Sequence, residues 1–500
     1  MAMEKESKLH ERMESIGNLS ASFPDIVIEA LISVARNRST EIYCVGGTVR
    51  DWLLGKQPND LDLTVSRDAE LFCRELMREL RGGTYVQLGT EEEEAARVVW
   101  NGLDIDISSF RGNTITIEDD LALRDFSING LAVGLTALAD GVGAKAIIDP
   151  MRGLADLQSG SLHHFPKAFE NDPLRLVRAF RFMATLGFEI CEETKSAIAE
   201  NAEAITTVAA ERVHYELDKI MLSSESSNVL WAMHKTGLLK HIIPELYEGS
   251  GVKQPGFHHL DVFHHNFQAL REMERLLKQP SVIYPHCANE ITQYLECDRV
   301  RVCLKWAALL HDVGKPAAQG ETADESRVTF YGHDEIGKKQ FEGFARRLKW
   351  SNEDRDRAAG LIAMHMHPFH LCTVQRQKKI SPRAALKLCR KAGEDLHGVF
   401  LLAMSDSLAS LGELKPEDIE EELVHLYRDV TDIYREHILP ALSGPPLLGG
   451  SDLIREFGLT PGPIFSEILD ELQSLQVEGQ VNTRDDALAW VEKFLSRQQG

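Results

Sequence analysis

Hydrophobic residues change their spacing along this chain, and the change predicts two kinds of structure. Residues 41–157 contain runs such as EIYCV, LDLTV and LDIDISSF, in which apolar and polar positions alternate with the period of a β-strand. Beyond this segment the apolar spacing is helical, as in residues 175–187, where Leu176, Phe180 and Met183 share one face. We therefore expect an α+β fold, with a small α/β unit followed by a mostly helical remainder.

The length predicts several domains. Five hundred residues are too many for one core, and about 150 residues per domain corresponds to about three units. The expected segments are 1–157, the α/β unit with an N-terminal helix; 158–250, a helical neck and body; 251–420, a helical domain that holds most of the histidines; and 421–500, a helical tail.

Composition and charge exclude several classes of protein. A hydrophobic fraction of 43% and a charged fraction of 26% are typical of a soluble, folded chain. No run reaches the ~18 apolar residues needed to cross a bilayer, and the charged start lacks a signal-peptide core, so we expect a cytoplasmic protein without a membrane partner. The net charge of −22 discourages nonspecific binding of polyanions, so any nucleic-acid function has to rest on local site chemistry.

The cysteines are scattered and form no CxxC pair. They lie at positions 44, 73, 191, 287, 297, 303, 372 and 389. In a cytoplasmic chain this spacing predicts reduced thiols and argues against a zinc site built from cysteine.

A pair of glycines follows the first predicted strand. Gly46 and Gly47 stand between YCV and a helix-like segment that contains Arg50 and Asp51. Glycines in this position let backbone N–H groups approach a phosphate at the start of a helix. The alternative is a tight turn without a ligand, which is the commoner role of such a pair.

Two pairs of aspartates occupy alternating strand positions. Asp60 and Asp62 project from one face of the predicted strand, and Asp104 and Asp106 from one face of another. Adjacent carboxylates repel, and Mg²⁺ held by carboxylates and substrate phosphates relieves the repulsion. The second pair could complete such a site, which would then activate a hydroxyl nucleophile. The alternative is that each pair is a solvated strand face.

Five motifs, in this order, carry a resemblance to a known family. They are GGTVRD at 46–51, DLDLTV at 60–65, LRDFSIN at 123–129, the DP…G…DL pattern at 149–157, and NDPLRLVRAFRF at 171–182. The chain resembles the class II tRNA nucleotidyltransferases and bacterial poly(A) polymerases. The resemblance implies a polymerase-β-like palm in which a tRNA 3′-hydroxyl attacks the α-phosphate of CTP or ATP and pyrophosphate leaves.

The resemblance also assigns roles in this palm. It implies that Asp60 and Asp62 hold Mg²⁺ and that Asp106 joins them as a catalytic carboxylate. The implied nucleotide-binding residues are Gly46, Gly47, Arg50, Arg124, Asp125, Asn129, Asp172, Arg175 and Arg178. The family usually has a second arginine where this chain has Leu123, which removes one expected phosphate contact.

Asp172 and Arg175 have an independent chemical reading. Asp172 precedes Pro173 and is a good helix N-cap, which alone would explain it. Asp172 and Arg175 are also three residues apart, so both fit one face of the first helical turn. A carboxylate accepts from the amino group of cytosine or adenine, and a guanidinium donates to the ring nitrogen of either base. In the resembled family such a pair selects C and A in place of a template.

A short segment bears on the number of nucleotides added. Only residues 112–117 separate Arg111 from Glu118. Six residues make a turn but not a long mobile loop. In the resembled family a shortened segment here accompanies enzymes that add CC and leave the final A to a separate enzyme, so addition of CC, or of CCA, is expected.

The histidine-rich half contains a second ordered set. Adjacent His311 and Asp312 lie at a predicted helix end in LLHDVGKP. The expected ligands of this site are His265, His311, Asp312, His333, His365 and Asp406, with His264 and His367 as rivals of their neighbours. Mixed N and O donors suit Mn²⁺, Fe²⁺, Ni²⁺ or Mg²⁺. The set resembles HD-domain metal phosphohydrolases, which implies hydrolysis of phosphoesters; a helical scaffold that holds RNA is the alternative.

The tail segments at 445–453, 460–463 and 481–488 also resemble HD-containing members of the family. The acidic run at 91–94 is expected to be a solvated loop. The expected function is template-independent addition of C, and of A in the CCA case, to tRNA. A poly(A) polymerase and a phosphohydrolase with a non-catalytic, RNA-binding palm are the alternatives.

Overall fold

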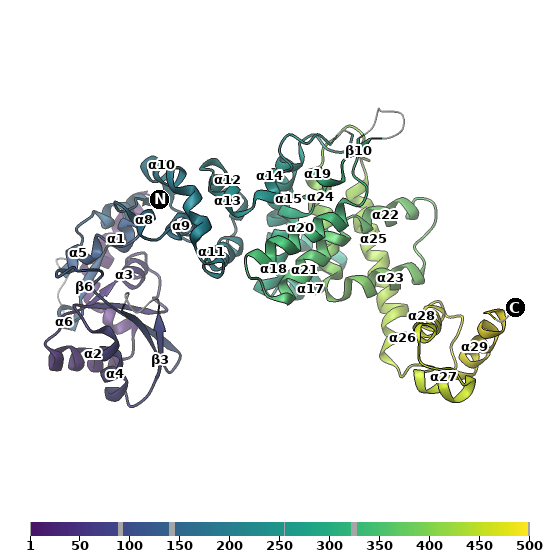
Figure 1. Ribbon diagram of the computed structural model, residues 1–500, viewed down its shortest axis with the longest axis horizontal. Coiled ribbons are helices and arrows are strands. Elements are labelled where there is room, and N and C mark those ends of the chain that lie inside the picture. The colour runs from purple at the N-terminus through teal and green to yellow at the C-terminus, as the bar shows by residue number, and fades with distance from the viewer. Residues whose placement is uncertain (1, 89–93, 140–145, 255, 322–327, 499–500) are drawn as a thin grey trace. The chain divides into compact units, whose positions relative to one another are not determined.

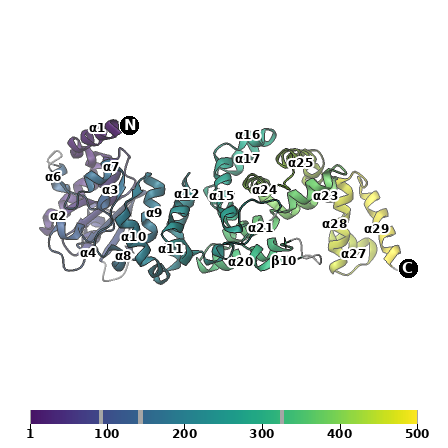
Figure 2. The same cartoon turned by 90° about the horizontal axis from the view of Figure 1, so that it is seen from above.

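Figures 1 and 2 show the chain as a computed structural model. It describes residues 2–88, 94–139, 146–254, 256–321 and 328–498. The chain divides into two compact units, the first made of Met1–Ile220 with Ala232–Ile242 and the second of Met221–Trp231 with Ile243–Gly500. The first unit contains the sheet and the second is almost wholly helical, which confirms the expected α+β fold. The finer division at 157, 250 and 420 stays a prediction.

A seven-stranded mixed sheet forms the first unit, as far as the described residues show. Its strands, in spatial order, are β3 (Thr84–Leu88), β4 (Ala95–Trp100), β5 (Leu103–Ser109), β2 (Leu61–Val65), β1 (Ile42–Val45), β6 (Ala132–Gly134) and β7 (Ile147–Ile148). β2 and β5 run parallel, and the other neighbouring pairs run antiparallel. The acidic run predicted as a solvated loop lies outside the described residues except for Glu94.

The alternation of apolar and acidic residues sets the faces of β2 and β5. Leu61 and Leu63 are buried, and Leu61 pairs in register with the buried Ile105. The aspartates between these positions therefore point to the opposite face, since successive strand residues alternate. The buried face packs on α4 (Ala69–Glu79), whose Phe72 and Leu76 are fully buried, and α2 (Asp25–Arg38) packs on α4.

Helices complete the first unit. They are α1 (Ala2–Glu14), α3 (Gly46–Leu53), α5 (Ile117–Leu121), α6 (Leu135–Ala139), α7 (Gly153–Ser159), α8 (Ala168–Asn171), α9 (Arg175–Leu186), α10 (Glu192–Asn201), α11 (Ala210–Leu222) and α13 (Leu238–Ile242). α3 packs against β1 and β2, which places the glycine pair at its start beside the carboxylates of β2. A short parallel pair joins β8 (Ser161–Leu162) and β9 (Glu189–Ile190).

A bundle of long helices forms the second unit. Its helices include α15 (Val262–Lys278), α18 (Asp298–Leu310), α20 (His333–Arg347), α21 (Asn352–Met364) and α24 (Leu396–Ala409). α15 packs on α18 and α24, and α21 packs on α18 and α20. α24 is apolar on all sides, from Val399 to Met404, because it is the central helix and is buried throughout.

Shorter elements surround this bundle. They are α12 (Ser226–Lys235), α14 (Pro244–Tyr247), α16 (Pro280–Ile283), α17 (Ala288–Tyr294), α19 (Lys315–Ala318), β10 (Gly320–Glu321), β11 (Val328–Thr329), α22 (His367–Gln375), α23 (Pro382–Ala392) and α25 (Ile419–Ile433). The buried ammonium of Lys305 on α18 donates to the carbonyls of Met221 and Ser223, 2.9 and 2.5 Å away. These bonds fix the start of the unit's chain onto its bundle.

The end of the chain forms a small helical group with its own apolar core. Its helices are α26 (Leu439–Ser443), α27 (Gly450–Phe457), α28 (Pro463–Val477) and α29 (Arg484–Gln498). Leu453, Ile468, Leu472 and Val491 are the centre of that core. α28 also packs on α23 of the bundle, where Arg383 pairs with Glu471.

No single described helix has the length and apolar content to cross a membrane; the bent pair Ile16–Ser22 and Asp25–Arg38, which meet at 110°, meets that test together. All eight cysteines are free thiols.

Candidate active sites

A cleft of about 960 Å³ opens in the first unit. It lies over the carboxyl end of β1, the length of β2, the end of β5, the segment from Phe110 to Asn129 and the start of α9. The sequence-predicted palm residues that line it are Gly46, Gly47, Arg50, Asp60, Asp62, Asp106, Arg124, Asp125, Asn129, Asp172, Arg175 and Arg178. The fold thus brings every predicted palm residue to one cavity.

The glycine pair allows a close approach that other residues would block. Gly46 has a φ of +58°, and a Cβ there would lie 3.2 Å from a guanidinium nitrogen of Arg124. A Cβ on Gly47 would lie 2.7 Å from Oδ2 of Asp62. The backbone of this turn therefore lies directly beside an arginine and a carboxylate, as a phosphate-binding turn requires.

The carboxylates of β2 carry unfavourable charge. Burial, together with the nearby Asp106, raises the pKa of Asp62 to about 6. Burial also raises the pKa of Asp60, and Asp104 and Asp106 add to the effect. Hard oxygen donors that repel one another are suited to a hard divalent cation, so Asp60 and Asp62 fit Mg²⁺.

Asp106 has a partner that the sequence did not reveal. Arg97 on β4 lies opposite Asp106 in the antiparallel register, and its Nε and Nη2 donate to the two Asp106 oxygens at 2.6 and 2.8 Å. Its Nη1 donates to Asp104 at 2.5 Å. The arginine thus forms ion pairs with the second aspartate pair, whereas Asp60 and Asp62 form no ion pair with another described residue. A basic residue directly across from an aspartate could have indicated this, had the register been known.

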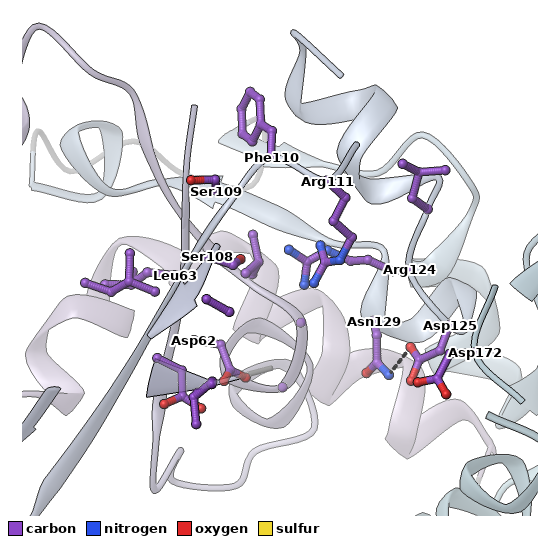
Figure 3. A pocket seen from close by; sticks show the side chains of 18 of the residues that line it. Asp62, Leu63, Ser108, Ser109, Phe110, Arg111, Arg124, Asp125, Asn129 and Asp172 are labelled. Atoms are coloured by element: carbon purple, nitrogen blue, oxygen red, sulfur yellow. Dashed lines mark hydrogen bonds between the residues drawn. The ribbon is translucent and has the colours of Figure 1, made fainter. Parts of the chain in front are cut away.

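Two arginines share one buried carboxylate above the aspartates. Nη1 of Arg111 lies 3.1 Å from each oxygen of Asp120, and Nη2 of Arg124 lies 3.1 Å from Oδ2. Asp120 is fully buried. Figure 3 shows both guanidinium groups together, with Asp62 on one side of the cleft and Asp125, Asn129 and Asp172 on the other. Arg111 was not among the predicted site residues, and it places a second cation near the expected arginine position that Leu123 occupies.

A chain of hydrogen bonds fixes the LRDFSIN segment. Arg50 donates from Nη1 to Oδ1 of Asn129 at 2.6 Å, and Nδ2 of Asn129 donates to Oδ1 of Asp125 at 2.8 Å. Arg178 donates from Nη2 and Nε to Oδ2 of Asp125 at 2.6 and 3.0 Å. Burial opposes ionisation of Asp125, but the charge of Arg178 and the bond from Asn129 hold its pKa well below the usual range. Arg178 thus acts on the cleft by positioning Asp125.

Both carboxylate oxygens of Asp172 are bonded in the turn that leads into α9. Its Oδ1 accepts from the backbone N–H of Leu174 at 3.1 Å, and its Oδ2 accepts from Arg212 at 2.8 Å. Arg175 donates from its two terminal nitrogens to the carbonyls of Leu123 and Arg124, at 3.2 and 3.1 Å. The prediction that Asp172 is the N-cap of this helix is wrong, because α9 begins at Arg175, its N-cap is Leu174, and no side chain caps it. Both side chains line the cleft, and each is fixed by the hydrogen bonds to the protein described above.

A second cluster lies in the core of the helical bundle. It combines two groups of candidate metal ligands that share Asp312: His265, His311, Asp312 and Asp406, and Asp312, His333 and His365. Oδ2 of Asp312 faces the first group, 3.3 Å from Nε2 of His311, and Oδ1 faces the second, 3.3 Å from Nε2 of His333. The geometry therefore brings all six predicted residues together.

Protonation of the histidines favours a cation at this cluster. The Nδ1 atoms of His311, His333 and His365 lie 2.9, 2.8 and 2.7 Å from backbone carbonyls, so each carries the proton and leaves Nε2 with a lone pair. Nε2 of His333 lies 3.1 Å from Nε2 of His365, and two lone pairs so close repel. Both oxygens of Asp312 are buried and accept no hydrogen bond of good geometry, and only Oδ2 has an ammonium, that of Lys315, as an ion-pair partner. The Nε2 lone pairs and the carboxylate oxygens are therefore free to act as metal ligands, and they fit one or two divalent cations.

The rivals of the predicted histidines lie elsewhere. His264 is half exposed and pairs with Asp261, while His265 is fully buried in the cluster. His367 lies outside the cluster and contacts Lys391.

A buried ammonium beside the cluster was not predicted. Nζ of Lys315 lies 2.5 Å from Oδ2 of Asp312 and 2.5 Å from Oε1 of Gln254, which accepts its hydrogen bond. His258, in T-shaped contact with His265, is 3.3 Å from the same ammonium. Burial and the charge of Lys315 lower the pKa of His258 to about 2. Lys315 thus places one fixed positive charge at the cluster edge.

Comparison with known proteins identifies the family. The description "Poly A polymerase head domain" matches residues 42–163, "Probable RNA and SrmB- binding site of polymerase A" matches residues 187–248, and "HD domain" matches residues 286–409. The chain is 32% identical to an A-adding tRNA nucleotidyltransferase of Deinococcus radiodurans, over 91% of this chain and 96% of that protein. This chain belongs to the family of tRNA nucleotidyltransferases and poly(A) polymerases. The resemblance seen in the sequence is thereby confirmed.

Other similar proteins are named for the addition of different nucleotides. A CC-adding tRNA nucleotidyltransferase of Thermus thermophilus is 29% identical over 90% of this chain and 93% of that protein. A solved CCA-adding enzyme in complex with CTP shares the fold, with a TM-score of 0.64 at 19% identity, and the match covers 96% of this chain and 98% of that one. The chain is thus a nucleotidyltransferase with an HD domain, while the names of its relatives cover A, CC and CCA addition.

Proposed function

We propose that this nucleotidyltransferase extends the 3′ end of tRNA without a template, adding C from CTP. The observation that supports this most strongly is the pair Asp60 and Asp62, whose pKa values are raised and which shares one cleft with the glycine turn and the arginines. The relatives named above are tRNA nucleotidyltransferases, and the matches to them cover at least 90% of each chain. A cytoplasmic location stays a prediction.

The cleft residues divide the work of the reaction. The tRNA 3′-hydroxyl gives up its proton to water and its oxygen forms a bond to the α-phosphorus. The bond between the α-phosphorus and the oxygen that bridges to the β-phosphorus breaks, and pyrophosphate leaves. Mg²⁺ on Asp60 and Asp62 would supply Lewis acidity for the hydroxyl and charge neutralisation for the phosphates. The N–H groups at Gly46 and Gly47, with Arg111 and Arg124, would hold the triphosphate. In this proposal Asp106 would exchange its ion pair with Arg97 for a contact with the cation.

Base selection is assigned to Asp172 and Arg175. Both line the cleft, with Asp172 on the side opposite Asp62 (Figure 3). Their carboxylate and guanidinium match the Watson–Crick edges of cytosine and adenine. Arg175 would exchange its bonds to the Leu123 and Arg124 carbonyls for bonds to the base.

We further propose that addition stops at CC. The segment between β5 and α5 is a compact turn, because Thr114 binds the carbonyl of Arg111 through its N–H at 3.3 Å and its hydroxyl at 2.8 Å. The backbone N–H of Arg111 in turn donates to Asp120 at 2.9 Å. A turn anchored at both ends suits a pocket of constant specificity better than one that switches from C to A.

For the bundle cluster we propose a metal-dependent phosphohydrolase activity. The six donor atoms and the Lys315 charge suit a phosphoester, since cations at the cluster would activate water and the ammonium would bind a phosphate oxygen. RNA 3′ ends that carry a phosphate or a 2′,3′-cyclic phosphate are the proposed substrates, because removing these groups restores the hydroxyl that the palm requires.

End sequencing tests the nucleotide assignment. Purified protein is incubated with Mg²⁺ and two tRNA transcripts, one ending at the discriminator base and one ending at CC, with CTP, ATP or both. Extension of the first transcript to CC and no extension of the second supports the proposal. Extension of only the second by A would assign A addition, complete CCA would refute the CC limit, and a long A tail would identify a poly(A) polymerase.

A further inference from the structure

One long segment of this acidic chain contains no acidic residue. The whole chain has a net charge of −22, yet residues 357–393 contain neither Asp nor Glu. The basic residues of this segment are Arg357, Arg376, Lys378, Lys379, Arg383, Lys387, Arg390 and Lys391. The segment runs from α21 through α22 and α23 (Figure 1). Such a segregation of charge gives a local basic surface on an acidic body.

The geometry of α23 places its lysines on one row. The apolar face of the helix is buried through Leu386 and Cys389 and their neighbours. Arg383, Lys387 and Lys391 follow at intervals of four residues, and all three are exposed. Residues spaced by four lie on one helix face with a rise of about 6 Å. Like charges at this spacing repel and destabilise an isolated helix, unless an anion lies against them.

The arginines and the lysines of the segment differ in their partners. Arg357, Arg376, Arg383 and Arg390 form ion pairs with Asp395, Glu422, Glu471 and Asp470 respectively. Among the described residues, Lys378, Lys379 and Lys387 form no ion pair. Lys391 donates to Nε2 of His367 at 3.0 Å, which orients the ammonium without cancelling its charge. The arginines thus stabilise the local packing, while four ammonium groups face solvent.

Solubility does not account for these lysines. A chain with a net charge of −22 is already far from neutrality, and four positive charges without an ion-pair partner bring it closer to neutrality. A ligand that carries regularly spaced negative charges explains both the absence of carboxylates and the exposed row. The phosphodiester backbone of RNA is such a ligand.

We propose that Lys378, Lys379, Lys387 and Lys391, called here the α22–α23 lysine surface, bind the phosphate backbone of the tRNA. The inference rests on the proposed tRNA function, and it adds a binding surface on the helical bundle to the cleft in the first unit. Lys391 contacts His367, which is the first residue of α22 and lies two residues after the cluster residue His365. RNA held on this surface therefore lies next to the element that leads out of the candidate phosphohydrolase site.

The salt dependence of binding tests this surface directly. The affinity for a labelled tRNA transcript is measured by fluorescence anisotropy between 50 and 300 mM KCl, with EDTA and without nucleotide. The double variants K378A/K379A and K387A/K391A are each expected to reduce the slope of log Kd against log [KCl] by about 1.5, since each phosphate contact contributes about 0.7–0.9. The matched control is K338A/K339A, an adjacent lysine pair on α20 of the same bundle, which should leave the slope unchanged.

The outcomes separate this inference from the proposed function. Under saturating tRNA the lysine variants should keep the wild-type kcat for CTP addition and show a raised KM for tRNA, with unchanged circular dichroism. An unchanged slope in both lysine variants would overturn the inference even if nucleotide addition is found. A reduced slope in a protein that adds no nucleotide would uphold the surface and refute the function. If the lysine variants bind tRNA as the wild type does but no longer bind phosphatidylglycerol vesicles, the surface is assigned to lipid and the inference is overturned.

Discussion

Asp62 on β2 and Asp106 on β5 lie directly opposite each other in parallel register. Arg97 contacts Asp106 from the third strand, so one carboxylate of the opposed pair has a counter-ion and the other does not. The pKa of Asp62 is raised to about 6 by burial and by the charge of Asp106, whereas no arginine donates to Asp62 among the described hydrogen bonds. The strand pairing therefore creates a place where a divalent cation lowers the electrostatic energy.

Separate active sites predict separable losses of activity. D60A/D62A should abolish CTP addition to tRNA and leave hydrolysis of a 2′,3′-cyclic phosphate unchanged. H311A/D312A should do the reverse, because its residues belong to the cluster in the second unit. Both activities are measured on the same preparations. Retained addition by D60A/D62A would indicate a non-catalytic palm, and loss of both activities in one variant would show that the assignment of sites is wrong.

The raised pKa of Asp62 predicts that Mg²⁺ binds less tightly in acid. A raised pKa favours the protonated carboxyl, so below pH 6 the cation has to displace a proton. The apparent affinity for Mg²⁺ in CTP addition should fall about tenfold for each pH unit below 6 and be nearly constant above 7. Mg²⁺ titrations of the initial rate at pH 5.5, 6, 7 and 8 measure this. A constant affinity over that range would contradict the role of Asp62.

The Asp125–Arg178 pair predicts a loss of stability. R178A leaves a buried carboxylate without its counter-ion and should lower the free energy of unfolding by about 3–5 kcal/mol. Because the pKa of Asp125 is depressed in the folded protein, its contribution is present above its unfolded pKa of about 3.9 and is lost as the pH falls. Urea unfolding followed by circular dichroism measures the change. D125N/R178A should be less destabilised than the sum of the single variants, and strict additivity would argue against the pairing.

Base selection by Asp172 and Arg175 predicts relaxed specificity. R175A should reduce the preference for CTP over UTP by about 5- to 100-fold, the equivalent of about 1–3 kcal/mol for a bidentate base contact. The ratio of kcat/KM for the two nucleotides measures it. R74A is the control, because Arg74 is an exposed arginine of α4 that pairs with Glu70 and is not among the residues that line the cleft. An unchanged ratio in R175A with reduced kcat would indicate that Arg175 only holds the segment of Leu123 and Arg124.

The two ligand groups predict a divided metal stoichiometry. H333N/H365N removes ligands from only one of the groups that share Asp312, so it should lower the metal content relative to wild type and leave the other group loaded. H265N is the complementary variant. Elemental analysis after dialysis against Mn²⁺ measures the content per chain. Loss of all metal in both variants would indicate a single cation that needs all six residues.

The sequence alone determined the local structure of this protein. Alternating apolar residues set the faces of β2 and β5, because a strand has only two sides, and the spacing of Leu176, Phe180 and Met183 set α9. The glycines, aspartates and histidines with special chemistry are also visible in one dimension, since few other residue types can replace them. For this reason all twelve predicted palm residues line one cleft and all six predicted bundle residues lie in one cluster.

Only the tertiary structure decided how those residues are paired. Arg97 reaches Asp106 through strand register, Arg111 and Arg124 meet at the buried Asp120, and Lys315 lies against Asp312. Each contact joins residues whose partnership depends on strand pairing or helix packing, and a one-residue shift in register would move each side chain to the other face. Charge compensation depends on distance in space, so which carboxylates remain free for a cation could be decided only by the fold.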